Sequence, residues 1–135
     1  MRATLAAAIF FAGVCIACAQ GGDTPKSGSA ERTAIMDVVR PACERDVGQK
    51  VIFRVQHLRL IRARVVPLRP DGSEINYSKT KYREANAEGA FDGEGEALLR
   101  RQGKGWKLLE WRFGASDTEV PIWFEKYGAP SALAD

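Results

Sequence analysis

The chain has 135 residues, of which 27% are charged and 45% hydrophobic, and its formal net charge is +3. A chain of this length builds one small domain rather than several. A net charge so close to zero does not by itself indicate a polyanion-binding protein.

Residues 1–19 have the pattern of a secretory signal. Arg2 supplies a positive start, and no charged residue follows from Ala3 to Ala19. The Ala17-Cys18-Ala19 triplet has the small-x-small form that precedes a signal-peptidase cut. We therefore expect cleavage between Ala19 and Gln20 and an exported protein, either periplasmic or secreted.

Two alternatives to ordinary cleavage remain open, and both also export the protein. Ile16-Ala17-Cys18 is similar to the end of a bacterial lipobox, although Cys15 stands where a lipobox usually has leucine. Lipidation at Cys18 would make the chain a membrane-tethered lipoprotein. An uncleaved anchor is the second alternative, but the apolar stretch is marginal against the about 20 residues that span a bilayer.

Removal of the signal changes what the remaining residues can build. Cys43 is the one cysteine left, so no intrachain disulfide forms and the fold rests on its core. One cysteine and His57, the single histidine, cannot form a zinc site of the usual Cys/His kind. Loss of Arg2 also lowers the formal net charge to +2.

Residues 20–29 (QGGDTPKSGS) predict a flexible linker, and residues 30–135 predict a single domain. Ser29 is a suitable helix cap, and Gly48 a suitable end. Apolar residues recur at helical spacing between them: Ile35, Val38, Val39, Ala42, Cys43 and Val47. Pro41 removes a backbone donor within this helix, so we expect a kink or a break there.

Alternation with a period of two then predicts strands. Residues 51–56 and 61–65 indicate two strands or one bent strand, because the segment between them offers no clear turn residue. Residues 69–72 (RPDG) predict a reverse turn. Residues 78–88 have a composition compatible with a short surface helix.

A hairpin is predicted over residues 94–101 and 106–113, closed by the Gly-rich turn between them. Trp106 and Leu108 fall on one face of its second strand, whereas Leu109 and Trp111 fall on the other, which requires a bulge near Leu108. A short helix near Pro121 ends at Gly128.

These elements add up to an α+β domain. We expect an N-terminal helix packed on an antiparallel sheet of about four strands, a short C-terminal helix, and all helices over one face.

The C-terminal part of the domain resembles a group of small exported bacterial proteins of unassigned function. Their pattern reads F-D-x4-A-L-L-R-R-x2-G-x-W, then G-x-[ST]-D, then Y-G-A-P. Here it corresponds to FDGEGEALLRRQGKGW, FGASD and WFEKYGAP, within residues 91–133. The general layout is also similar to cystatin-like and NTF2-like domains, which host binding modules and enzymes alike. Neither resemblance supplies an active site.

The most distinctive charge feature is a basic segment followed by an acidic one. No acidic residue occurs from Val47 through Pro70, whereas residues 71–98 carry seven. Candidate contacts to an acidic envelope partner or an anionic membrane surface are Arg54, Arg59, Arg62 and Arg64. The competing interpretation is that the acidic segment faces these arginines and neutralises them. Nucleic acid is not expected as a partner, because no binding motif is present.

No catalytic residue, cofactor site or metal site is predicted. His57 has no carboxylate nearby in sequence to orient it, so a dyad with Cys43 lacks a third group. Asp92, Glu94 and Glu96 alternate as in a calcium loop, but the other ligands of such a loop are missing. We therefore expect a non-catalytic binding module of the cell envelope. The alternative is an envelope enzyme with His57 or Asp117 in a pocket.

The intact mass of the native protein, measured in its soluble and membrane fractions, tests the export prediction. A mass that begins at Gln20 is the expected result. A diacylated mass that begins at Cys18 would instead establish the lipoprotein form.

Overall fold

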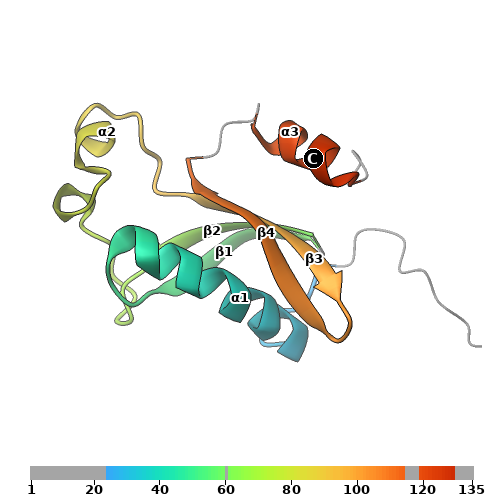
Figure 1. Ribbon diagram of the computed structural model, residues 1–135. Coiled ribbons are helices and arrows are strands. Elements are labelled where there is room, and N and C mark those ends of the chain that lie inside the picture. Colours follow the sequence, from blue (N-terminus) through green and yellow to red (C-terminus); the bar gives the residue numbers. More distant parts are fainter. Residues whose placement is uncertain (1–23, 60, 115–118, 130–135) are drawn as a thin grey trace, which may run out of the picture.

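The computed structural model describes residues 24–59, 61–114 and 119–129, which form an α+β domain (Figure 1). An N-terminal helix packs on a four-stranded antiparallel sheet of order β1-β2-β3-β4. The elements in chain order are α1 (Ala30–Val47), β1 (Ile52–Arg59), β2 (Arg62–Leu68), the 3-10 turn η1 (Tyr77–Lys79), α2 (Arg83–Ala87), β3 (Gly95–Gln102), β4 (Gly105–Phe113) and α3 (Glu119–Tyr127).

α1 begins and ends where its capping residues predict. The Ser29 side chain accepts a hydrogen bond from the Arg32 amide, and Gly48 takes the left-handed conformation with φ of 71°. The predicted break at Pro41 is wrong, because the helix continues through it. Pro41 lies on the exposed side, while Val39 and Ala42 are buried on either side of it. Packing of that buried face offsets the lost backbone hydrogen bond.

The first two strands form a hairpin rather than one bent strand. Arg59 pairs with Arg62, so the connection consists of residues 60 and 61 alone. Neither is Gly, Asn or Asp, which are the residues that usually mark such a tight turn. An extra residue at Gln56 forms a bulge, since the register shifts between Val55 and His57.

The second hairpin confirms the predicted bulge in its second strand. Leu98 pairs with Glu110 and Leu99 with Leu108, so Leu109 is the extra residue. Leu108 then packs against the core under α1, whereas Leu109 packs against α3. The bulge shifts the alternation by one residue, so that Trp106 and Leu108 before it and Trp111 after it all pack against the core under α1.

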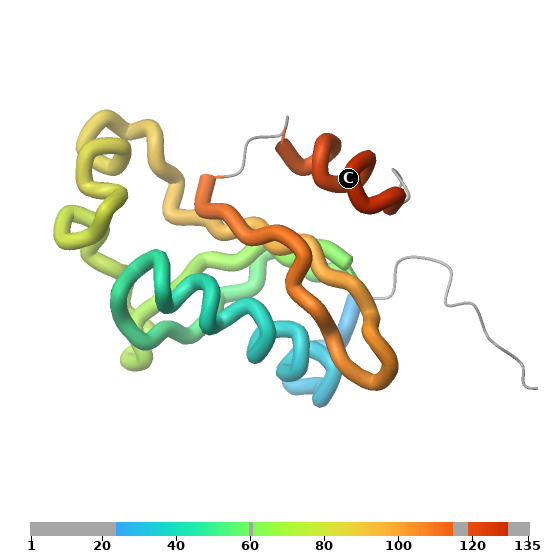
Figure 2. Tube along the Cα trace, viewed as in Figure 1, coloured from blue at the N-terminus to red at the C-terminus, as the bar shows by residue number. Residues whose placement is uncertain are grey.

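α1 and α3 cover opposite faces of the sheet, so the expectation that all helices lie over one face is wrong (Figures 1 and 2). The core under α1 includes Ala97 and Leu99, and the core under α3 includes Leu98. Successive residues of a strand point to opposite faces. The run Ala97-Leu98-Leu99 is apolar throughout because β3 is buried on both sides.

The connection from β2 to β3 folds over one end of the sheet (Figure 2). The predicted turn is present, since the Gly72 amide donates to the Arg69 carbonyl at 2.8 Å. The surface helix expected over residues 78–88 is divided into η1 and α2. Five aromatic rings hold this connection against α1 and β4, with centroids 4.6–6.4 Å apart: Tyr77, Tyr82, Phe91, Trp111 and Phe113.

A substitution at Gly95 tests this packing, because a Cβ added there would overlap the Trp111 ring. Trp111 is fixed in turn by its indole N–H, which donates to Asp46 at 2.9 Å. Gly95→Ala should lower the free energy of unfolding by about 1–3 kcal/mol, measured by urea denaturation followed by far-UV circular dichroism. Gly105→Ala is the matched control, since its Cβ would meet only the Gln102 carbonyl at 3.8 Å. Equal stability of the two variants would contradict this packing.

Candidate binding face

The face of the sheet that points away from α1 carries most of the polar side chains of the first three strands. We define the polar face by these residues: Arg54, Gln56, His57, Arg62, Arg64, Glu94 and Glu96. Their placement follows from strand alternation, because Ala63, Val65 and Ala97 between them belong to the core under α1. The segment with no acidic residue and the acidic segment thus meet at one surface.

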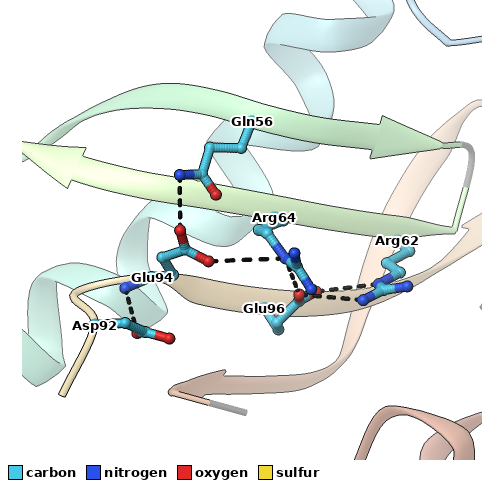
Figure 3. A network of polar contacts seen from close by, with 6 residues as sticks. All are labelled: Gln56, Arg62, Arg64, Asp92, Glu94 and Glu96. Atoms are coloured by element: carbon cyan, nitrogen blue, oxygen red, sulfur yellow. Dashed lines mark hydrogen bonds and ion pairs between the residues drawn. The ribbon is translucent and has the colours of Figure 1, made fainter. Parts of the chain in front are cut away.

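A buried carboxylate lies at the centre of the polar face (Figure 3). Glu96 is 3% exposed and accepts hydrogen bonds from two guanidinium groups. The Arg62 Nε and Nη2 groups donate to its two oxygens at 3.2 and 3.3 Å, and the Arg64 Nε donates at 2.5 Å. Arg62 is itself 8% exposed. A buried charge is destabilising unless such partners replace its hydration, so removal of one member of this network should destabilise the fold.

The other two carboxylates of the alternating acidic motif have their own donors. The Gln56 amide donates to Glu94 at 2.8 Å, and the Arg64 Nε lies 3.9 Å from the same carboxylate. The Asp92 carboxylate accepts from the Glu94 amide at 2.8 Å and closes a local turn (Figure 3). Glu94 and Glu96 therefore share Arg64, whereas Asp92 is engaged with a backbone amide, so the three carboxylates are each occupied by protein donors.

His57 lies on the polar face among arginines. It pairs with Arg64 in the β1–β2 register, and its Nε2 is buried with no hydrogen-bond partner among the described residues. Burial lowers the pKa of its imidazole, and the neighbouring charges of Arg62 and Arg59 lower it further. His57 is thus favoured in its neutral form.

Cys43 lies on the other side of the sheet from His57. It is fully buried in a core cluster with Val47 and Phe113. Burial, reinforced by Asp46 and Glu44, raises the pKa of its thiol to about 12. A protonated, buried thiol that the sheet separates from the histidine does not form a nucleophile–base pair.

A pocket of about 420 Å³ opens at one end of the polar face, beside the β2–β3 connection. Arg54 and Gln56 line it from β1, and Tyr77 lines it from η1. The Tyr77 hydroxyl is buried and has no hydrogen-bond partner among the described residues. Three carboxylates also line it: Glu74, Asp92 and Glu94. Neither His57 nor Glu96 is among the lining residues. With one cation against three carboxylates, the pocket does not favour an anionic ligand inside it.

The four arginines predicted to contact an anion occupy different environments. Arg62 is buried against Glu96, and Arg64 is half-buried between Glu96 and Glu94. Arg59 is half-buried at the end of β1, whereas Arg54 is exposed. The other predicted site residues, Cys18, Ala19, Gln20 and Asp117, lie outside the described residues.

Sequence reasoning missed the specific pairing of Arg62 and Arg64 with Glu96. The signal for it was the common period of two in β2 and β3, because Arg64 and Glu96 are direct cross-strand partners. Finding it required the register between strands that are about thirty residues apart, and the two strands alone do not fix that register.

Comparisons of the chain with protein-family models, with curated proteins and with solved structures find no match. Among residues 24–59, 61–114 and 119–129, no helix has the length and apolar character needed to cross a membrane.

Removal of the Glu96 charge tests the buried network. Glu96→Gln keeps the side-chain shape but removes the negative charge that Arg62 and Arg64 bind, so the free energy of unfolding should fall by roughly 3 kcal/mol in urea denaturation. Glu94→Gln is the control from the same strand and face. Because this carboxylate is partly exposed, its loss should lower the free energy of unfolding by about 1 kcal/mol or less. A smaller loss for Glu96→Gln than for Glu94→Gln would show that the buried pair is not structurally required.

Proposed function

We propose that this chain is a non-catalytic binding module of the cell envelope whose partner is anionic. Its export rests on the signal pattern of residues 1–19, with release after Ala19 or lipidation at Cys18 as the two routes. The function rests on the residues of the folded domain. The partner we propose is an acidic protein segment rather than the membrane surface.

The observation that carries this proposal is the contrast between β1 and β2. The arginines of β2 are engaged with Glu96 inside the fold. On β1, by contrast, Arg54 is exposed and forms no ion pair within the described part of the chain. β1 contains no carboxylate residue. A basic strand at the border of the sheet therefore attracts and orients an acidic partner.

The alternative of an envelope enzyme requires titratable groups that converge on a pocket. The pocket beside the polar face contains carboxylates and Arg54 but not His57. Glu96 is the buried carboxylate near His57, and two guanidinium groups already hold it. These arrangements support a binding function over catalysis.

Binding of a fluorescent polyglutamate peptide to the mature chain, measured by anisotropy at low salt, tests the proposal. Arg54→Glu should weaken binding about tenfold, and added salt should weaken the wild type. Arg45→Glu is the matched control, because Arg45 is exposed on α1 and lines neither the pocket nor the groove between α1 and β1. Equal affinities of the two variants would contradict the proposal. Binding to phosphatidylglycerol vesicles without peptide binding would assign the membrane as the partner.

A further inference from the structure

We propose that an extended acidic segment of a partner protein adds to the sheet as a fifth strand along Ile52–Val55 of β1. The inference rests on the proposed function, because it specifies how the anionic partner is held. Its site is the border of the sheet together with the groove between β1 and α1. Arg54 lies beside this border and also lines the pocket of the polar face.

β1 is an edge strand in the described structure, since β2 is its only neighbour in the sheet. Edge strands present backbone N–H and C=O groups that pair readily with another chain. The bulge at Gln56 interrupts the edge, so the regular part consists of the first four residues of β1. Ile52 at its start is 41% exposed, which is high for a large apolar side chain.

The orientation of the edge groups follows from Pro67. Phe53 pairs with Pro67, which has no backbone N–H to give to a neighbouring strand. Pro67 therefore suits a cross-strand position at which the two paired residues exchange no backbone hydrogen bonds. The N–H and C=O of Phe53 then point to the open edge, and alternation places those of Val55 beside them. Two outward residues define the pairing register of an added strand.

A groove of about 320 Å³ accompanies this edge on the side of α1. It is lined by Ile52, Phe53 and Val55 from β1, and by Met36, Arg32 and Arg40 from α1, without a carboxylate residue. Arg40 is paired with Asp37 at 2.5 Å on the helix surface. Alternate side chains of an added strand would enter this groove, and the remaining ones would lie beside Arg54. The arginines on the α1 side, where no carboxylate lines the groove, select carboxylates in the partner. On the other side, Arg54 shares its pocket with three carboxylates, so its contribution is the smaller one.

The charge of β1 also argues against a second copy of this chain as the occupant. β1 carries Arg54, His57 and Arg59 and no acidic residue. Two copies paired edge to edge would bring like charges together, which destabilises a strand pair. An acidic partner segment is the occupant that the charges favour.

Hydrogen exchange of the mature chain, followed residue by residue with NMR, tests the inference. The probe is a peptide of alternating glutamate and valine. Bound peptide should slow exchange of the Phe53 and Val55 amides by at least about tenfold, because these amides become paired. The amides of β4 should not change. The same peptide with every backbone amide N-methylated is the control, since it keeps the side chains but has no N–H to donate to the edge.

A second readout uses the groove itself. Arg32→Glu should weaken binding of the alternating peptide about tenfold, whereas Arg45→Glu, on the same helix but outside the groove, should leave it unchanged. Binding that Arg54→Glu abolishes without protection of Phe53 and Val55 would overturn strand addition and leave the proposed function standing. Absence of binding by this peptide and by polyglutamate would overturn both. Protection at β4 instead would also overturn the inference.

Discussion

The buried charge of Glu96 constrains the rest of the domain. This side chain lies in the strand between β2 and β4, and removing a carboxylate from water there costs several kcal/mol unless cations replace its hydration. Arg62 and Arg64 do so, and they reach Glu96 only when β2 pairs with β3 in one register. A shift of one residue would move both arginines into the apolar core under α1. The ion network thus specifies a strand alignment that apolar packing alone would define less sharply.

The same constraint explains why the arginines of β1 and those of β2 lie in different environments. β2 contributes its arginines to the interior, so they are structural groups. β1, one strand further out, has no acidic strand on its other side within the described residues. Its exposed Arg54 lies at the border of the sheet, where we propose that a partner binds. Position in the sheet, more than the number of arginines, decides which of them are available to a partner.

Much of this fold was predictable from the sequence, because its signals are local. Ser29 and Gly48 delimit α1. The apolar residues Trp106, Leu108 and Leu109 do not fit one regular alternation, and the structure contains the bulge that this pattern requires. The errors concern long-range packing. The helix runs through Pro41 because core contacts on both sides of it outweigh a local preference. The face of the sheet that α3 covers is the one to which Leu98 and Leu109 point. That face can be identified only once the register between the strands is known.

The candidate site was less predictable than the fold. The four arginines look equivalent in the sequence, and burial and cross-strand partners distinguish them only in three dimensions. The groove beside α1 combines residues that are about twenty positions apart, such as Arg32 and Ile52. No local sequence motif predicts such a groove. Sequence reasoning located the basic and the acidic segment, but which of their side chains stay exposed depends on the position of each strand in the sheet.

The bulge at Leu109 has a consequence for how this domain tolerates sequence change. The extra residue lets Trp106, Leu108 and Trp111 all contribute to the core under α1, and it leaves Leu109 to contact α3. Each layer then has its own residues of β4. A substitution at Leu109 therefore alters the contact with α3 without removing a side chain from the core under α1.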